Sequence, residues 1–363
     1  MQKKLRIGMV GAGFMGRAHS NAYRQVRHFF DVPFELECRA VCARNRENLT
    51  KLAARWGWAE TTTDWEALID RPDIDVVDIA APNAMHAPVA IRAAEAGKIV
   101  WCEKPLSTNL AEAERIVAAA RGVPSMVWYN YRRVPAISFA KRLVDDGRIG
   151  RAFHYRATYL QESGNDPTRP PSWKTIREHA GSGVLGDLLS HVVDSSLWLN
   201  GAIREVSGMM QTFADGRDVD DATLALVRFA NGSVGTFEAT RYATGCRNRN
   251  GFEMHGQLGM LRFNLEDMNH IEFFDATEPR NLQAPRRLLV TGPDHPYAAN
   301  FWKPGHIIGY EHTFIAALGD FLGALAEGRP FHPDFEDGLH VEKVLDAVQR
   351  SARTGRWMEV EQA

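Results

Sequence analysis

The sequence predicts an α/β protein of two domains. The first is expected to be built on a doubly wound parallel sheet, and the second to be an α+β domain with a large, mainly antiparallel, open-faced sheet. Strand-like and helix-like segments alternate through the first third of the chain, whereas strand-like segments dominate after about residue 150. The 363 residues also exceed the usual size of one domain. We therefore place the domains at residues 1–128 and 129–363.

The first third contains five predicted strands separated by helices. Short apolar runs predict the strands at Leu5 to Val10, Glu35 to Cys42, Ile74 to Ala80, Lys98 to Cys102 and Ser125 to Tyr129. The first helix is expected to end near Arg27, and the others span Glu47 to Trp56, Trp65 to Leu68, Ala87 to Ala96 and Leu110 to Arg121. Helices of about ten residues between consecutive strands are typical of parallel βαβ units.

The remainder of the chain has a different pattern. Strands are predicted at Ala152 to Leu160, Glu205 to Phe213, Ala222 to Phe229 and Ser233 to Thr240, the last two joined by the hairpin signal Asn231-Gly232. Helices are predicted at Val184 to Leu199, Tyr310 to Leu325 and Asp337 to Arg353, and a long loop at Glu278 to Gly305. This pattern predicts the antiparallel second sheet.

Composition excludes several classes of protein. Lys and Arg number 43 against 45 Asp and Glu, so the formal net charge of −2 gives no electrostatic basis for binding nucleic acid or an anionic membrane. No apolar run approaches the roughly 20 residues of a membrane span. The four cysteines form no Cys-x-x-Cys pair, so we expect reduced thiols in a cytoplasmic protein, and no metal site.

A glycine motif follows the first predicted strand and opens the first helix. Its three glycines are Gly11, Gly13 and Gly16. In a dinucleotide fingerprint the first makes a tight turn, the second lets the backbone approach a pyrophosphate, and the third lets helix and strand pack closely. The free N–H groups of the helix then face the anion. The motif therefore predicts that the first domain is a dinucleotide-binding Rossmann domain.

The end of the second predicted strand bears on the choice of dinucleotide. NAD sites usually carry an acid there for the ribose hydroxyls, whereas NADP sites supply a cation for the 2′-phosphate. This chain has Ala43 at that place and Arg44 next to it. We therefore expect NADP in preference to NAD, although Arg44 could also be a solvated charge at the start of a helix.

Three side chains are candidates for the chemistry. Lys104 follows the predicted strand that ends at Cys102, at the carboxyl edge of the parallel sheet where ligands bind. Asp187 and His191 lie four residues apart in one predicted helix and are expected on one face of it. A carboxylate beside a histidine can orient the ring and tune its pKa for work as a base. Each residue, taken alone, could equally be structural.

Several motifs in this order resemble those of the Gfo/Idh/MocA oxidoreductases, a family named for glucose–fructose oxidoreductase and inositol dehydrogenase. The motifs are the Gly11 to Gly16 fingerprint with Ala18-His19 behind it, Ala81-Pro82-Asn83 followed by His86, Glu103-Lys104-Pro105, and the helix with Asp187 and His191. The resemblance covers essentially the whole chain. It implies that Lys104, Asp187 and His191 form the catalytic set.

The binding residues are expected as follows. Those for the dinucleotide are Gly11, Gly13, Phe14, Met15, Gly16, Ala43, Arg44, Ala81, Pro82, Asn83, His86, Glu103 and Lys104. Those for the substrate are Lys104, Arg132, Arg133, Tyr159, Trp173, Asp187, His191 and Arg241. Arg132, Arg133, Tyr159, Trp173 and Arg241 are the weaker candidates, each equally consistent with a structural role.

Further segments resemble the levoglucosan dehydrogenase and pyranoside dehydrogenase branch of this family. They are Tyr129 to Arg133, Thr158 to Gln161, Pro171 to Trp173 and Gly305 to Phe314. Two features depart from the branch: Ala43 stands where it has an acid, and the segment from Gln161 to Gly164 lacks an expected tryptophan. The identity of the sugar therefore stays open.

These expectations describe an NAD(P)-dependent dehydrogenase acting on a secondary alcohol of a sugar pyranoside, anhydrosugar or cyclitol. His191 takes the hydroxyl proton, Lys104 stabilises the charge on the oxygen, and Asp187 orients His191. Two alternatives stay open: a glycosidase that retains its cofactor, and a regulator that binds the dinucleotide without catalysis. The second domain is expected to bind substrate and to form a homodimer or homotetramer, with no nucleic-acid or membrane partner.

Overall fold

The computed structural model describes residues 3–166 and 172–361, and its contacts divide the chain into two units. Unit 1 contains residues 1–130 and 310–339, and unit 2 contains residues 131–309 and 340–363. The predicted boundary after residue 128 leaves out the return of residues 310–339, because the sequence pattern does not show which core a late helix joins. Pro171, one of the residues of the expected branch resemblance, lies outside the described residues.

Unit 1 is built on a six-stranded sheet in the order β3-β2-β1-β4-β5-β6, in which all pairs are parallel. Its strands are β1 (Lys3–Val10), β2 (Phe34–Cys42), β3 (Glu60–Thr62), β4 (Val76–Ile79), β5 (Ile99–Cys102) and β6 (Ser125–Val127). Its helices are α1 (Phe14–Phe29), α2 (Arg46–Trp56), α3 (Trp65–Ile69), α4 (His86–Glu95), α5 (Leu110–Ala119) and α10 (Tyr310–Glu327). The predicted doubly wound parallel sheet is confirmed, and β3 is a strand that the prediction missed.

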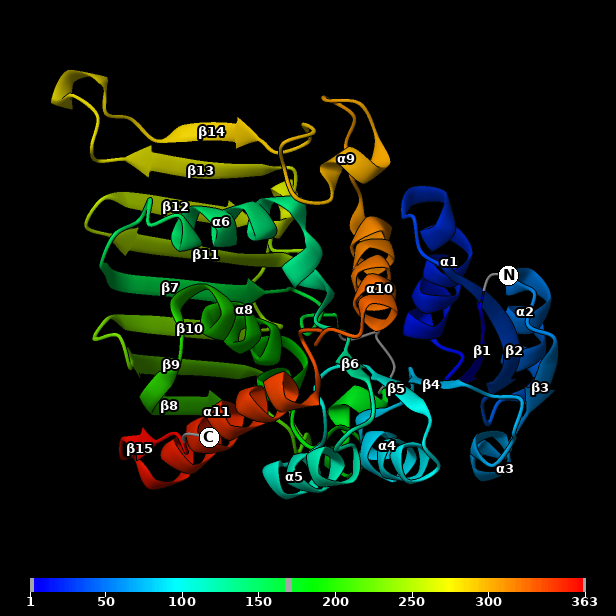
Figure 1. The fold of residues 1–363 in the computed structure, drawn as a ribbon. Coiled ribbons are helices and arrows are strands. Elements are labelled where there is room, and N and C mark those ends of the chain that lie inside the picture. The colour runs from blue at the N-terminus through cyan, green and yellow to red at the C-terminus, as the bar shows by residue number, and fades with distance from the viewer. Residues whose placement is uncertain (1–2, 167–171, 362–363) are drawn as a thin grey trace. The chain divides into compact units, whose positions relative to one another are not determined.

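Helix α10 completes the core of unit 1 by packing against α1 (Figure 1). The two helices approach closely at Gly319, where a Cβ atom would lie 2.6 Å from the ring of Phe30. Phe321 of α10 makes an edge contact with the fully buried Trp101 of β5, with ring centroids 5.4 Å apart. Burial of aromatic side chains such as Phe321 stabilises the packing of α10 in unit 1.

Unit 2 is built on a nine-stranded sheet in the order β14-β13-β12-β11-β7-β10-β9-β8-β15. Neighbouring strands are antiparallel except for β7 and β10. The strands are β7 (Ala152–Leu160), β8 (Ile203–Gln211), β9 (Ala222–Phe229), β10 (Val234–Thr240), β11 (Arg249–Gly256), β12 (Gly259–Asn264), β13 (His270–Asp275), β14 (Arg286–Leu289) and β15 (Met358–Glu359). The predicted open-faced, mainly antiparallel sheet is confirmed, with β9 and β10 joined through Asn231-Gly232.

Helices cover one face of this sheet. Helix α6 (Pro135–Asp145) packs on β12 and β13, and α8 (Ser190–Asn200) packs on β7 (Figure 1). The later part of α11 (Phe335–Thr354) packs on β8, where the N–H of Gly208 bonds Ser351 Oγ at 2.9 Å. The short helices α7 (Arg177–Ala180) and α9 (Ala298–Phe301) lie in connecting segments. The segment predicted as a long loop therefore contains β14 and α9.

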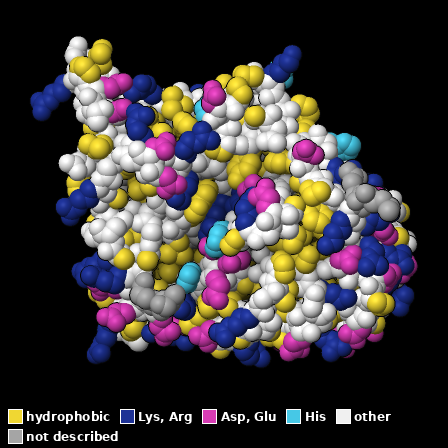
Figure 2. Space-filling model, in the orientation of Figure 1, with side chains coloured by type: hydrophobic (Ala, Val, Ile, Leu, Met, Phe, Trp, Pro, Cys, Tyr) yellow, Lys and Arg dark blue, Asp and Glu magenta, His cyan; other side chains and the backbone are white. Residues whose placement is uncertain are grey.

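Helix hydropathy and surface charge can be compared with the expectation of no membrane or nucleic-acid partner. Among the described residues no helix is both long enough and apolar enough to cross a membrane. On the face shown in Figure 2, Lys and Arg side chains are mixed with Asp and Glu side chains and do not gather into a patch of one sign.

Candidate active site

The glycine loop between β1 and α1 has the backbone geometry that a dinucleotide needs. Gly11 has a φ of +122°, and a Cβ atom there would collide with the carbonyl of Ala80, so only glycine can make this turn. A Cβ at Gly16 would lie 2.6 Å from the carbonyl oxygen of Gly11, whereas a Cβ at Gly13 would meet nothing within 4 Å. Gly13 is also the N-cap of α1 and provides no side-chain cap. The loop thus leaves open space before the first turn of a helix, which fits a pyrophosphate.

The end of β2 carries no acid. Cys42 ends the strand, Ala43 is half-buried, and Arg44 is exposed. Asn45 caps α2 by accepting the N–H of Asn48 at 2.9 Å. Arg44 is therefore the cation next to the strand end, at the start of α2, as the sequence predicted.

The segment after β4 contains two buried residues of the expected cofactor site, Asn83 and His86. Asn83 is buried and begins a short 3₁₀ turn (Asn83–Met85) that leads into α4. His86 is fully buried; its Nδ1 lies 2.9 Å from the carbonyl oxygen of Pro105, and its Nε2 lies 3.1 Å from that of Ala81. Burial lowers the pKa of His86, and the hydrogen bonds to the two carbonyl oxygens oppose that shift.

Glu103 and Lys104 follow β5 directly, as predicted. Glu103 is only 5% exposed, and its Oε2 accepts the N–H of Lys104 at 3.2 Å. The backbone on both sides of Lys104 is therefore held, by Glu103 before it and by His86 at the carbonyl of Pro105 after it.

The segment with Asp187 and His191 differs from the predicted regular helix. Residues Leu185–Leu189 form a π-helical turn that runs into α8, so Asp187 and His191 are not related by the spacing of an α-helix. Asp220 holds the start of this turn, because its carboxylate accepts the N–H of Gly183 at 2.6 Å and that of Leu185 at 2.8 Å. π-Helical turns occur frequently at functional sites.

Asp187 lies between two cations of unit 2. Lys174 Nζ donates to its two oxygens at 2.9 and 3.0 Å, and Arg241 donates to Oδ2 at 2.5 Å. The Arg241 side chain is 9% exposed and the Lys174 side chain 43% exposed. A cavity of about 330 Å³ opens beside these two cations and is also lined by Ser163 and Ser172. The carboxylate is thus fixed in its orientation by two cations that line a polar cavity.

His191 is packed between two tyrosines. Its ring centroid lies 4.5 Å from that of Tyr131 and 5.7 Å from that of Tyr159, and the residue is 6% exposed. The two tyrosine hydroxyls are 3.1 Å apart, and Tyr159 also donates to Asn248 Oδ1 at 2.8 Å. Gln161 Nε2 donates to the same oxygen at 2.9 Å. His191 therefore belongs to a mainly buried polar cluster.

Other predicted substrate residues have different surroundings. Arg132 is 4% exposed and forms a buried ion pair with Asp194 of α8, at 2.6 Å from Nη2 to Oδ1. This geometry favours a structural tie to α8 over contact with a sugar. Arg133 is also buried, whereas Trp173 is half-buried with Lys174 Nζ 5.7 Å from its ring centroid.

The sequence does not identify several residues that contact Asp187, Tyr159 or the π-helical turn. Lys174, Asn248 and Asp220 were not candidates, although Lys174 follows the predicted Trp173 directly. Asn248 and Asp220 lie in polar turns without a motif, so no local signal identifies them.

Within residues 3–166 and 172–361, one group of side chains has the donor types of a metal site. His332, Asp334 and Asp337 lie at the start of α11, with ligand atoms within 4.8 Å of one another. Asp334 and Asp337 each accept the other's backbone N–H at 3.0 Å, which is the usual arrangement of a helix cap. Capping accounts for this cluster.

The sequence matches known families over most of its length. Residues 5–131 match the family described as oxidoreductases with an NAD-binding Rossmann fold, and residues 137–262 match the GFO/IDH/MocA C-terminal domain. Levoglucosan dehydrogenase of Pseudarthrobacter phenanthrenivorans is 40% identical over 390 residues, which cover 99% of each chain. Inositol 2-dehydrogenase of Rhizobium meliloti is 26% identical and covers 98% of this chain and 99% of its own.

Solved structures resemble the chain over nearly its whole length. A levoglucosan dehydrogenase in complex with NADH gives a TM-score of 0.97 at 40% identity and covers 99% of this chain and 100% of its own. An oxidoreductase domain protein from Kribbella flavida gives 0.96 at 45% identity, with the same coverage. The resemblance expected from the motifs is confirmed.

Proposed function

Because the chain belongs to the GFO/IDH/MocA oxidoreductase family, we propose that it is a dehydrogenase for a secondary alcohol of a sugar pyranoside, anhydrosugar or cyclitol. The observation that carries the proposal is the mainly buried polar cluster around His191, with Asp187 fixed by Lys174 and Arg241 beside a cavity. A nicotinamide dinucleotide, when bound, accepts the hydride from the alcohol carbon.

The side chains divide the remaining work of alcohol oxidation. His191 removes the hydroxyl proton as the C–H bond breaks, and the ammonium of Lys104 stabilises the negative charge that develops on the oxygen. Asp187 orients His191 and accepts a hydrogen bond from a neighbouring hydroxyl of the ring. Lys174 and Arg241 hold that carboxylate in place. Tyr131 and Tyr159 restrict the His191 ring to one orientation.

Levoglucosan is the first substrate to test. The similar levoglucosan dehydrogenase has been solved in complex with NADH and levoglucosan, at 40% identity and a TM-score of 0.96. A screen of levoglucosan, aldohexoses and inositols with each dinucleotide, read by nicotinamide absorbance, tests the proposal. Turnover without added dinucleotide would instead support a glycosidase with a retained cofactor. Tight dinucleotide binding without any turnover would support a regulator.

For the cofactor, we propose a nicotinamide dinucleotide, NADP or NAD. The NADH complexes of the similar levoglucosan dehydrogenase support NAD, whereas the missing acid at Ala43 and the exposed Arg44 favour NADP. Arg44→Ala is expected to weaken NADP binding about tenfold or more, since a hydrogen bond to a charged group contributes about 1.5–3 kcal/mol. NAD binding should change little. Calorimetric titration of both dinucleotides checks this, with Arg46→Ala as the neighbouring exposed control.

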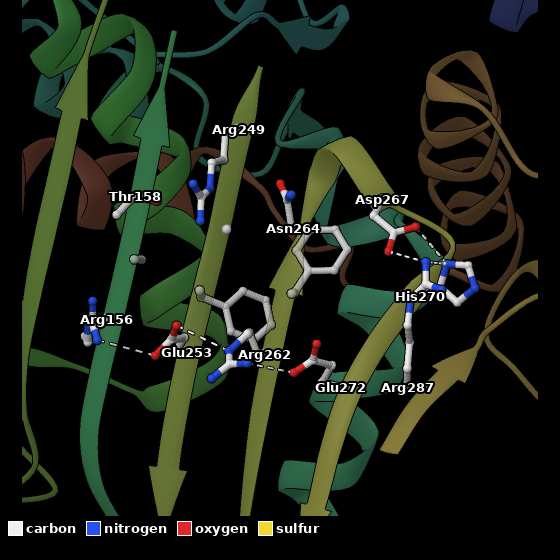
Figure 3. A pocket seen from close by; sticks show the side chains of 14 residues that line it. Arg156, Thr158, Arg249, Glu253, Arg262, Asn264, Asp267, His270, Glu272 and Arg287 are labelled. Atoms are coloured by element: carbon white, nitrogen blue, oxygen red, sulfur yellow. Dashed lines mark hydrogen bonds and ion pairs between the residues drawn. The ribbon is translucent and has the colours of Figure 1, made fainter. Parts of the chain in front are cut away.

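We further propose that two or four copies associate through the open face of the unit 2 sheet. A row of side chains in register crosses this face from β8 to β14: Ser207, Leu226, Thr236, Arg156, Glu253, Arg262, Glu272 and Arg287. Ion pairs join Glu253 to Arg156 at 3.5 Å and to Arg262 at 3.3 Å, and Arg262 to Glu272 at 2.8 Å (Figure 3).

A second copy fits this face in two respects. The charges in the row alternate in sign, so a second row shifted by one position opposes each charge with its opposite. Leu226 of the row is 52% exposed, and Met209 and Val234 nearby are 59% and 49% exposed, so these side chains add apolar surface to this face. Leu226→Asp should reduce the mass found by sedimentation to that of a smaller assembly, whereas Leu282→Asp, at a 64% exposed site in a 3₁₀ turn outside the row, should not. An unchanged mass for Leu226→Asp would contradict this interface.

The location proposed for the protein is cytoplasmic. All four cysteines are free thiols, as is usual in a reducing compartment.

A further inference from the structure

A buried charge network lies behind the glycine loop and has no part in the reaction described above. His19 of α1 is fully buried, and each of its ring nitrogens faces a carboxylate. Nδ1 is 2.7 Å from Asp78 of β4, and Nε2 is 3.0 Å from Glu103. The network thus joins the first helix to two neighbouring strands inside unit 1.

The geometry fits a positively charged His19. Carboxylates only accept hydrogen bonds, so both ring nitrogens must donate, and only the imidazolium has two N–H groups. Burial by itself would lower the pKa of His19, but the two carboxylates outweigh it and raise the pKa to about 9. Asp78 also accepts hydrogen bonds from the Tyr23 hydroxyl and, at 2.9 Å, from Trp128 Nε1.

Uncharged groups close the rest of the pocket around the ring. Trp128 stacks on His19 with ring centroids 4.2 Å apart, and Phe314 of α10 lies 5.6 Å away. The titratable groups that face His19 are therefore Asp78 and Glu103 directly, and Tyr23 through Asp78. In this setting the imidazolium is the counter-charge for both carboxylates.

Glu103 connects His19 to the backbone of Lys104. One oxygen of Glu103 is taken by His19 and the other accepts the Lys104 N–H at 3.2 Å. The carboxylate therefore has little freedom to rotate, and the backbone of Lys104 is held through it. A displacement of about 1 Å at a reacting group can cost a hundredfold in rate.

We propose that His19 is a positioning residue: by joining Asp78 to Glu103 as an imidazolium, it fixes the backbone from which Lys104 reaches the reacting oxygen. The inference rests on the proposed function, because Lys104 receives its role there. A buried ion pair that served stability alone would have a different signature, since its loss would lower the melting temperature and leave the turnover of the folded protein unchanged.

His19→Gln removes the imidazolium and keeps one amide that can donate to one carboxylate. We expect kcat to fall by about tenfold or more, while the Kd for the dinucleotide stays within about threefold. His28→Gln is the matched control, because His28 is an exposed residue of the same helix, and it should leave both constants unchanged. A folded His19→Gln variant that retains the kcat of the unaltered protein would overturn the proposal.

Two readouts do not depend on turnover. Imidazole nitrogen NMR of the unaltered protein should show both nitrogens of His19 protonated at pH 7, and a neutral ring would overturn the proposal without any variant. The rate at which an amine-reactive reagent labels Lys104, measured by peptide mass spectrometry, should change by about threefold or more in His19→Gln. Labelling of the exposed Lys51 should not change.

These readouts separate the two proposals. If the unaltered protein oxidises no sugar in the screen, the proposed function fails, and the NMR and labelling results still decide whether His19 positions Lys104. Unchanged Lys104 labelling in folded His19→Gln would count against the positioning role even if the dehydrogenase activity is found.

Discussion

The two sets of residues assigned to the reaction are supported in different ways. In unit 1, Glu103 and Lys104 follow β5 and are held by His19 and His86, both fully buried. In unit 2, Asp187 lies in a π-helical turn and is held by Arg241 and by the half-exposed Lys174. The first arrangement depends on short, buried contacts between regular elements. The second depends on Lys174 from a 3₁₀ turn and on Arg241 directly after β10, and Lys174 is the more exposed of the two.

This difference suggests a division of labour. In the proposed function, the buried arrangement presents one ammonium group to one oxygen, whereas the two cations that hold Asp187 line a polar cavity of about 330 Å³. The following experiments test that contrast, from the largest expected effect to the smallest.

Removing the reacting groups should have the largest effect in both units. Lys104→Ala and His191→Ala are each expected to lower kcat by about 10²–10⁴, the range for a lost acid, base or charge-stabilising group. Dinucleotide affinity should stay nearly intact. Melting temperature and kcat are measured on the same samples, with Lys51→Ala and Lys141→Ala as surface controls. Full activity in folded Lys104→Ala would exclude the proposed mechanism.

The buried network of unit 1 should make stability depend on pH. The pKa of His19 rises from 6.5 in the unfolded chain to about 9 in the folded protein. Its contribution is therefore fully present below about pH 6.5 and is lost as pH rises to about 9. At about 1.4 kcal/mol per pKa unit, the loss is on the order of 3 kcal/mol.

Urea unfolding at several pH values between 6.5 and 9 measures this loss against His19→Gln, which lacks the titrating group. The difference in unfolding free energy between the two proteins should shrink steadily with rising pH. A difference that is constant across this range would contradict a charged His19.

The two cations of unit 2 should differ in their effect on catalysis. Arg241→Ala removes a mostly buried partner of Asp187 and is expected to lower kcat/KM by about 10–100-fold. Lys174→Ala removes a partner whose side chain is 43% exposed, so solvent screens the pair and the loss should be at most about fivefold. Steady-state kinetics with the best substrate of the screen measures both. Equal losses would show that Lys174 contributes more than its exposure suggests.

The positions of the unit 1 motifs could largely be predicted from the sequence. The residues from Gly11 to Gly16 and from Glu103 to Pro105 are contiguous, and each motif stands at the end of a strand that the apolar pattern identifies. The support behind them could not be predicted, because Asp78 and Glu103 lie 59 and 84 residues from His19 and meet it only through the order of the strands. Asp78 stands inside a buried strand and carries no local signal.

The unit 2 part was predicted less completely. The pattern of the sequence identifies Asp187 and His191 as candidates, but it does not predict the π-helical turn that contains Asp187, because that turn depends on Asp220 from a distant segment. Asn248 lies 89 residues from Tyr159 and meets it through the sheet register. For the fold, β11 shows a readable strand pattern that the prediction did not use, with Phe252 and Met254 buried on either side of Glu253.

The return of the chain into unit 1 has a consequence for synthesis in the cell. Residues 1–130 contain every strand of the parallel sheet, but Phe314 and Phe321 of α10 belong to the same core. At ribosomal rates of about 5–20 residues per second, those side chains emerge on the order of 10–40 s after β6. During that interval α1 lacks its partner helix, and Trp101 and the pocket of His19 lack part of their cover. The core of the first unit is thus complete only after α10 has been made.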